Sequence, residues 1–151
     1  MAKFIYRMQS ILDIKVKLET QAKMQFASAK HALDIEEEKL KVLRDRREGY
    51  FEEARNLRNN SLNVKQLRDN KAAIQTMDNF IEEQKGQVRA AQDRLEAARV
   101  KLQEVMQERK IQEKLREKSF EDFLMEENHR ESKEVDELTS YTYGQRRMEK
   151  Q

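Results

Sequence analysis

The chain of 151 residues contains no proline, no cysteine and no tryptophan, and only 3 glycines. Proline removes a backbone donor and clashes with the preceding turn, at a cost of roughly 3 kcal/mol inside a helix. Its absence therefore permits long uninterrupted helices, and a sheet protein would need turn residues that are missing here. The absence of cysteine excludes disulfides, thiolate metal sites and thiol nucleophiles, and it fits a reducing compartment.

Long apolar runs are also missing. No stretch approaches the roughly 18 apolar residues of a membrane span, and the apolar cluster Phe4–Tyr6 is far shorter than the apolar part of a secretory signal. We therefore expect a cytoplasmic protein. Only 37% of the residues are hydrophobic and 7% are aromatic, which predicts a thin core instead of a wide globular interior.

Charged residues make up 40% of the chain, but the two signs nearly cancel. Lys and Arg number 31 against 29 Asp and Glu, so the formal net charge is +2. A nucleic-acid-binding domain usually carries a clear basic excess, so we expect no nucleic-acid partner. A rod that binds nucleic acid through Arg44, Arg46 and Arg47 is an alternative, which steep salt-dependent binding to duplex DNA would support.

Apolar residues recur at alternating spacings of three and four, which is the pattern of a coiled-coil seam. The first part of the chain has two such series, the second one residue out of phase: Phe4, Met8, Ile11, Leu18, Ala22 and Ala29, then Leu33, Leu40, Leu43, Tyr50, Ala54 and Leu57. The later part is a regular heptad repeat of Leu67, Ile74, Ile81, Val88, Leu95 and Leu102. Past Val105 the apolar phase changes at Ile111 and Leu115, which predicts a shifted face there.

A cluster of turn-favouring residues, Asn59–Asn63, separates the two parts. Either Asn63 or Ser61 can cap the second helix with a side-chain oxygen, and Gln66 has the spacing of a capping-box partner. The predicted fold class is all-α, a long antiparallel two-helix coiled-coil hairpin with a longer second helix. We expect a single domain with helices at about 3–58 and 64–140, a turn at 59–63 and a frayed tail at 141–151.

Residues that carry catalysis or bind metals are not arranged for either role. His31 and His129 lie in different predicted helices without HxxxH or HExxH spacing, so a solvated helix face is the better interpretation of both. Motifs of the forms GxxxxGK[ST], GxGxxG and GxSxG are absent. We therefore predict no enzyme activity, no cofactor and no metal.

Two groups of apolar residues exceed what a two-helix seam can bury. The predicted loop end is crowded by Tyr50, Phe51 and Phe80. Past the end of the partner helix lie Phe120, Phe123, Leu124 and Met125. Apolar groups left in water favour docking, so we expect two protein-binding surfaces, with self-association through the same residues as the alternative.

Several short segments, spread over nearly the whole chain, match one family. They are Phe4–Leu12 with Lys15 and Glu19, then Glu37–Lys41, Ile74–Thr76, Lys114–Lys118 and Glu131–Glu137. Through these segments the chain resembles the FliJ family, the small coiled-coil component of the bacterial flagellar type III export apparatus.

The resemblance implies a stalk in the centre of the export ATPase hexamer that also contacts the cytoplasmic domain of the export gate protein FlhA, at the cytoplasmic face of the inner membrane. The implied ATPase-binding residues are Phe4, Met8, Phe120, Phe123 and Leu124. The implied gate-binding residues lie near the loop and are Lys39, Leu43, Arg46, Tyr50, Ala73, Met77, Phe80 and Gln84. Arg46 and Ala73 stand where some relatives carry aromatic groups, and Leu43 and Met77 also fit the seam, so core and docking roles compete there.

The mechanism that the resemblance implies is stimulation of the ATPase without ATP hydrolysis by the chain itself. Two other functions stay open: an export chaperone or escort that holds unfolded subunits, and a structural coiled-coil scaffold. Export chaperones are a further class of partner that the resemblance leaves open.

Overall fold

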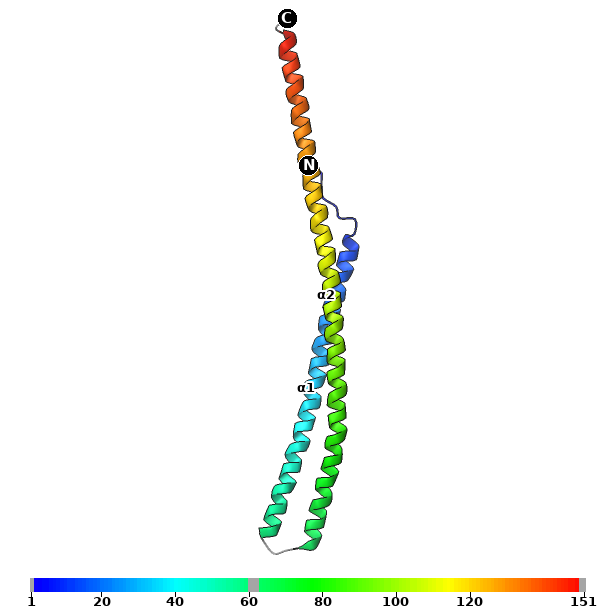
Figure 1. The fold of residues 1–151 in the computed structure, drawn as a ribbon, viewed down its shortest axis with the longest axis vertical. Coiled ribbons are helices and arrows are strands. Elements are labelled where there is room, and N and C mark those ends of the chain that lie inside the picture. Colours follow the sequence, from blue (N-terminus) through cyan, green and yellow to red (C-terminus); the bar gives the residue numbers. More distant parts are fainter. Residues whose placement is uncertain (1, 60–62, 150–151) are drawn as a thin grey trace. The chain divides into compact units, whose positions relative to one another are not determined.

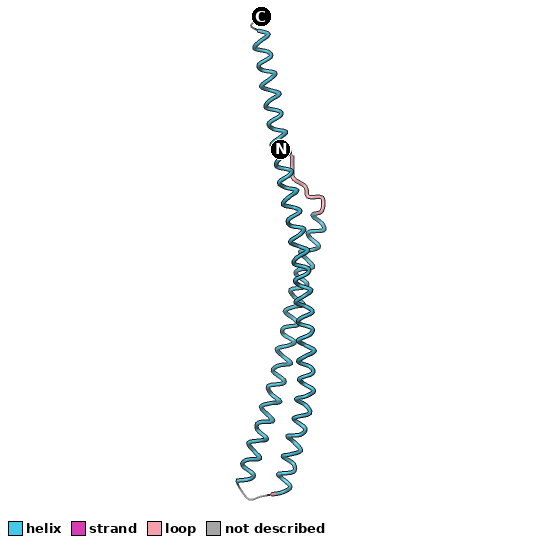
Figure 2. The backbone as a smooth tube through the Cα atoms, in the orientation of Figure 1, coloured by secondary structure: helices cyan, strands magenta, loops and turns pink. Residues whose placement is uncertain are grey.

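The computed structural model describes residues 2–59 and 63–149 of the chain. Two helices account for almost all of this part: α1 spans Gln9–Asn59 and α2 spans Val64–Glu149 (Figures 1 and 2). They are 51 and 86 residues long, and the described residues contain no strand. The prediction of an all-α hairpin with a longer second helix is confirmed.

The chain divides into two compact units, and each unit pairs a stretch of α1 with a stretch of α2. The terminal unit consists of Met1–Glu19 and Val105–Gln151, and the central unit is Thr20–Glu104. The seam between the helices is therefore packed separately in each unit.

The core of the central unit is a cluster of Leu40, Ile81 and Val88, whose exposed fractions are 9%, 7% and 8%. Leu33 and Leu43 pack against this cluster. An antiparallel pair places Leu40 beside Ile81 and Leu33 beside Val88, and all four residues belong to the same core. Each buried aliphatic side chain contributes about 1.5–3 kcal/mol, so this thin seam holds the two helices together in the central unit.

One heptad register describes the inward positions of both helices. Position a falls at Leu12 in α1 and at Leu67 in α2, and on every seventh residue after each, while position d follows three residues later. Every buried residue of the described helices occupies one of these positions: Leu12, Glu19, Ala22, Leu40, Ala54, Asn70, Met77, Ile81, Val88, Ala91 and Val105.

The predicted change of phase at Leu33 is wrong, because the register of the later part of α1 continues back to Leu12. Ile11 and Leu18, predicted in the seam, are each 38% exposed, whereas Leu12 is 7% and Glu19 6% exposed. An uninterrupted helix turns by a fixed angle per residue, so its inward face does not shift to follow apolar residues. A polar residue such as Glu19 is accepted there because it finds a partner on α2.

The phase change predicted past Val105 is wrong for the same reason. Ile111 and Leu115 are 58% and 43% exposed. The inward positions at this level hold the polar residues Arg109 and Gln112, both of which are half-buried. Apart from Leu12 and Val105, the seam of the terminal unit is therefore largely polar, and Ile111 and Leu115 lie outside it.

The start of α2 is capped as predicted by Asn63. Its Oδ1 accepts hydrogen bonds from the backbone N–H groups of Lys65 at 3.0 Å and Gln66 at 3.4 Å. These bonds satisfy two donors of the first helical turn, which have no partner within the helix. The other predicted cap, Ser61, lies outside the described residues.

The outer ends of the helices differ from the prediction. α1 begins at Gln9 instead of near residue 3, and α2 continues to Glu149 through the residues predicted to fray from 141 onward. Every described residue of α2 from 128 on is exposed, so its backbone is held by its own helical hydrogen bonds. A stretch long and apolar enough to cross a membrane occurs in neither helix, as far as the structure describes them.

Candidate docking surfaces

An aromatic cluster of three rings lies in the terminal unit. Phe4, in the segment before α1, meets Phe120 edge-on with ring centroids 5.1 Å apart, and its ring lies 5.4 Å from that of Phe123. The rings of Phe120 and Phe123 are stacked with centroids 6.5 Å apart. The guanidinium of Arg116 lies 5.7 Å from the centre of the Phe4 ring, within range of a cation–π contact. These contacts hold the N-terminal segment on α2.

The N-terminal segment is not helical, and its contacts give the reason. Tyr6 is buried, and its hydroxyl donates a hydrogen bond to Gln112 Oε1 at 3.2 Å. Residues two apart point about 200° from each other on a helix but to the same side of an extended chain. Phe4 and Tyr6 can therefore both contact α2 only from an extended segment, and Ile5 between them is 78% exposed.

The residues implied in ATPase binding come together in part. Phe4 and Phe123 line an open pocket of about 570 Å³ together with Met8. Phe120 and Leu124 are 42% and 44% exposed. The expectation that Phe120 and Phe123 have no partner past the end of the first helix is wrong, because the segment before α1 packs against both rings.

Ionic side chains cross the seam of the terminal unit. Glu19 Oε2 pairs with Arg109 Nε, and Arg109 Nη1 donates a hydrogen bond to Glu113 Oε2 at 2.7 Å. The bond to Glu113, together with the Glu19 carboxylate, raises the pKa of the Arg109 guanidinium above its usual value. Lys15 Nζ pairs with Glu108 Oε2 at 2.8 Å. Such pairs add little net stability compared with apolar packing, but they disfavour any register that separates them.

Polar residues at d positions also cross the seam of the central unit. Gln84 Nε2 donates hydrogen bonds to the backbone oxygen of Glu36 at 2.9 Å and to its Oε2 at 2.5 Å. The bond to Glu36 Oε2 is the main reason why the pKa of that carboxyl lies below its usual value. Asn70, which is buried, donates from Nδ2 to the backbone oxygen of Tyr50 at 2.9 Å. The half-buried amide of Gln84 and the buried amide of Asn70 therefore both donate to the facing helix.

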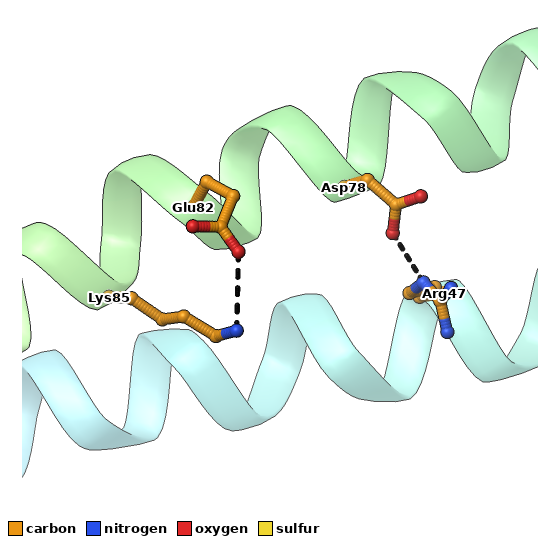
Figure 3. Close-up of polar contacts among 4 residues, drawn as sticks. All are labelled: Arg47, Asp78, Glu82 and Lys85. Atoms are coloured by element: carbon orange, nitrogen blue, oxygen red, sulfur yellow. Dashed lines mark hydrogen bonds and ion pairs between the residues drawn. The ribbon is translucent and has the colours of Figure 1, made fainter.

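Figure 3 shows an ion pair that joins the helices of the central unit, next to an ion pair within α2. Arg47 Nε lies 2.5 Å from Asp78 Oδ1, and Lys85 Nζ lies 3.2 Å from Glu82 Oε1. The Arg47 guanidinium also lies 4.5 Å from the centre of the Phe51 ring. The Arg47 and Asp78 side chains are 38% and 49% exposed, so their pairing orients the helices more than it stabilises them.

The residues implied in gate binding fall on one side of the central unit. By the register, the g positions are Lys39, Arg46, Ala73 and Phe80, and the d positions are Leu43, Tyr50, Met77 and Gln84. Positions d and g are neighbours around a helix, and the g positions of two antiparallel helices lie on the same side of the pair. Met77 is 8% exposed and belongs to the seam, whereas Phe80 is 46% exposed. Lys39, Arg46 and Phe80 therefore form the accessible part of this side, and Ala73 is half-buried.

Sequence reasoning missed the contacts of Tyr6 and the ionic seam around Arg109. The signal for the seam was present, because the spacing of Leu40 and Leu33 leads back by sevens to Glu19 and Leu12. No local pattern marks Tyr6, since its partner Gln112 lies 106 residues away in the sequence.

The chain matches the family model of the flagellar FliJ protein over residues 4–148. It is also similar to the solved structure of a Chlamydia trachomatis protein that is described as a candidate YscO homolog, with a TM-score of 0.65 and 21% sequence identity. This similarity covers 97% of the chain and 99% of the other protein, and at this identity it shows a shared fold. No curated protein sequence matches the chain.

Proposed function

We propose that this chain, which belongs to the FliJ family of flagellar proteins and is thus a component of type III protein export, acts as a stalk. In this role it binds and stimulates the export ATPase ring and links the ring to the export gate. The terminal unit is the proposed ATPase-binding part, and the central unit carries the proposed gate-binding side. The chain would reach the cytoplasmic face of the inner membrane through these partners.

The aromatic cluster of the terminal unit carries the ATPase part of the proposal. Beside the contact with Phe4, α2 presents Phe120, Leu124 and Met125, which are 42%, 44% and 70% exposed. Apolar side chains in water that adjoin a fixed aromatic cluster favour a protein partner that covers them. Binding of the chain can shift the nucleotide state of this partner only by the difference in affinity between the partner's states for the chain.

ATP hydrolysis by the export ATPase of the same organism tests this part. We expect the purified chain to raise the rate, and the double variant Phe120→Ala, Leu124→Ala to lose the stimulation because both side chains contribute exposed apolar surface. Val135→Ala is the matched control, since Val135 is 59% exposed on a part of α2 outside the cluster. Absence of both stimulation and association with the wild-type chain would contradict the proposal.

The gate part of the proposal depends on one side of the central unit. Arg46 and Phe80 occupy g positions on the two helices, and both are exposed. Arg44 is also exposed but occupies position e, which lies on the other side of the helix pair. Comparing a change at Arg46 with the same change at Arg44 therefore distinguishes an effect of this side on gate binding from a general effect of lost positive charge.

Calorimetric titration with the cytoplasmic domain of FlhA tests the gate part. Arg46→Ala combined with Phe80→Ala should weaken binding by about tenfold or more, because Arg and aromatic residues carry much of the energy of interfaces. Arg44→Ala should bind as the wild type does. An equal loss in Arg44→Ala and in the double variant would show that this side of the central unit is not the gate-binding side.

A further inference from the structure

A strip of aliphatic side chains remains in water on the terminal unit, apart from the aromatic cluster. Its members are Ile11, Ile14, Leu18, Ile111 and Leu115, with exposed fractions of 38%, 55%, 38%, 58% and 43%. Three come from α1 and two from α2. Only 37% of the residues of the chain are hydrophobic, yet these side chains lie in water while Glu19, Arg109 and Lys15 take seam positions beside them.

The register places the whole apolar strip on one side of the helix pair. Ile11, Leu18 and Leu115 occupy g positions, and Ile14 and Ile111 occupy c positions, which adjoin g around the helix. The g positions of antiparallel helices lie on the same side, so the two rows run next to each other. Phe120 and Leu124 occupy e and b positions on the other side of the pair, and Phe123 occupies an a position in the seam. The apolar strip therefore lies on a different side of the pair from Phe120 and Leu124, the two residues changed in the ATPase test.

Positive charge borders the apolar strip. Lys17, Lys114 and Lys118 occupy the c and f positions next to it, and Arg7 lies in the turn before α1; all four are exposed. The acidic side chain at a g position within the same stretch, Glu108, pairs with Lys15 at 2.8 Å. On the side of the e and b positions the same stretch carries three acidic residues and one basic residue: Asp13, Glu113, Glu117 and Lys110. The basic border thus belongs to the side of the apolar strip.

We infer that the apolar strip is a docking site for an acidic amphipathic helix of another protein. Two parallel rows of aliphatic side chains, one on each helix, fit the apolar face of a third helix that lies along the pair. Arg7 just before α1 and Lys17 on α1, with Lys114 and Lys118 on α2, would face acidic residues on the flanks of that helix. Charge complementarity of this kind speeds encounter and excludes basic helices.

A second copy of the chain fits this site poorly. The part of α2 past residue 127 is acidic between 131 and 137, but its apolar residues Val135 and Leu138 occupy f and b positions. In an antiparallel dimer along α2, the strip of each copy would contact the tail of the other, so strip and tail residues would have to lie on the same side of α2. Val135 and Leu138 lie on a different side from Ile111 and Leu115, so they cannot cover the strip of a second copy. A lipid surface is disfavoured as well, because the strip contains no Trp, Phe or Tyr to sit at a membrane interface.

The test is fluorescence anisotropy with a labelled synthetic helix of about 20 residues that carries Leu at heptad a and d positions and Glu at most others. We expect the full chain to bind this probe, and Ile14→Glu and Ile111→Glu each to weaken binding by about tenfold or more. Val135→Glu is the matched control, because Val135 is 59% exposed and Ile111 is 58% exposed, and it should bind as the wild type does. A probe with Lys in place of Glu should not bind.

Other results would overturn the inference. They are no binding of the acidic probe up to about 1 mM, binding that Ile111→Glu leaves unchanged, or equal binding of a scrambled probe without an apolar face. Sedimentation that shows a dimer of the wild-type chain, and a monomer of Ile111→Glu, would assign the strip to a second copy. Binding to anionic phosphatidylserine vesicles that Ile111→Glu abolishes would assign it to a membrane. Stimulation of the export ATPase is measured separately, so failure here leaves the stalk proposal standing.

Discussion

Replacing Leu12 by alanine should destabilise the protein more than replacing Leu18, although both residues are leucines of α1 in the terminal unit. Leu12 is 7% exposed and Leu18 is 38% exposed. Deleting a buried leucine side chain costs its transfer free energy and leaves a cavity, so we expect Leu12→Ala to lower the free energy of unfolding by about 2–3 kcal/mol. Leu18 already contacts water and leaves no closed cavity, so its replacement should cost about 1 kcal/mol.

Urea unfolding, monitored by circular dichroism at 222 nm, measures the difference in the free energy of unfolding between the two variants. If the terminal unit opens on its own, hydrogen exchange of its amides measures the same difference. Both variants make the same change inside a helix, so differences in helix propensity cancel. Leu12 lies nearer than Leu18 to the start of α1 at Gln9, where fraying weakens the effect of a mutation. The comparison is therefore biased against the prediction. An equal or larger loss for Leu18→Ala would refute the register and restore the one predicted from apolar spacing.

Two further predictions concern the central unit. Gly86→Ala should stabilise the chain by about 1 kcal/mol in the same urea assay, because alanine has a higher helix propensity than glycine. A Cβ at position 86 would meet nothing within 4 Å, so the change causes no clash. A loss of stability would contradict this prediction. The bond from Gln84 lowers the pKa of Glu36 from its usual 4.5, so its contribution to stability is present above that pH and is lost as the pH falls through the folded pKa. Glu36→Gln should therefore remove part of the fall in Tm between neutral pH and about pH 3, and a variant with the acid sensitivity of the wild type would contradict this origin.

The hairpin, the cap at Asn63 and the seam of the central unit were predictable because local signals agree there. The heptad of α2 places Ile81 and Val88 in the core, and the same residues are buried in the structure. The asparagine that precedes α2 was recognisable from cap chemistry alone. In these places propensity, apolar spacing and tertiary packing favour one arrangement.

The terminal unit was predicted less well because its apolar residues do not mark the inward face. Ile11 and Leu18 suggested one face of α1, whereas the buried positions are Leu12 and Glu19. Apolar spacing assumes that a seam is apolar, and an ionic pair across two helices breaks that assumption. The predicted start of α1 was wrong for another reason. Phe4 and Met8 have helical spacing, but the rings of Phe120 and Phe123, distant in the sequence, hold the segment before α1 extended on α2.

The two units therefore use their apolar residues in opposite ways. In the central unit Leu40 and Ile81 fill the seam, and the helices need no further partner to bury them. In the terminal unit Glu19 and Arg109 occupy the seam, and comparable aliphatic groups such as Ile111 lie in water. Leaving an aliphatic side chain exposed forgoes about 1.5–3 kcal/mol of stabilisation, which the hairpin cannot recover by itself. A protein that covers these residues recovers part of that free energy, so the terminal unit is the part of the hairpin whose stability depends most on a bound partner.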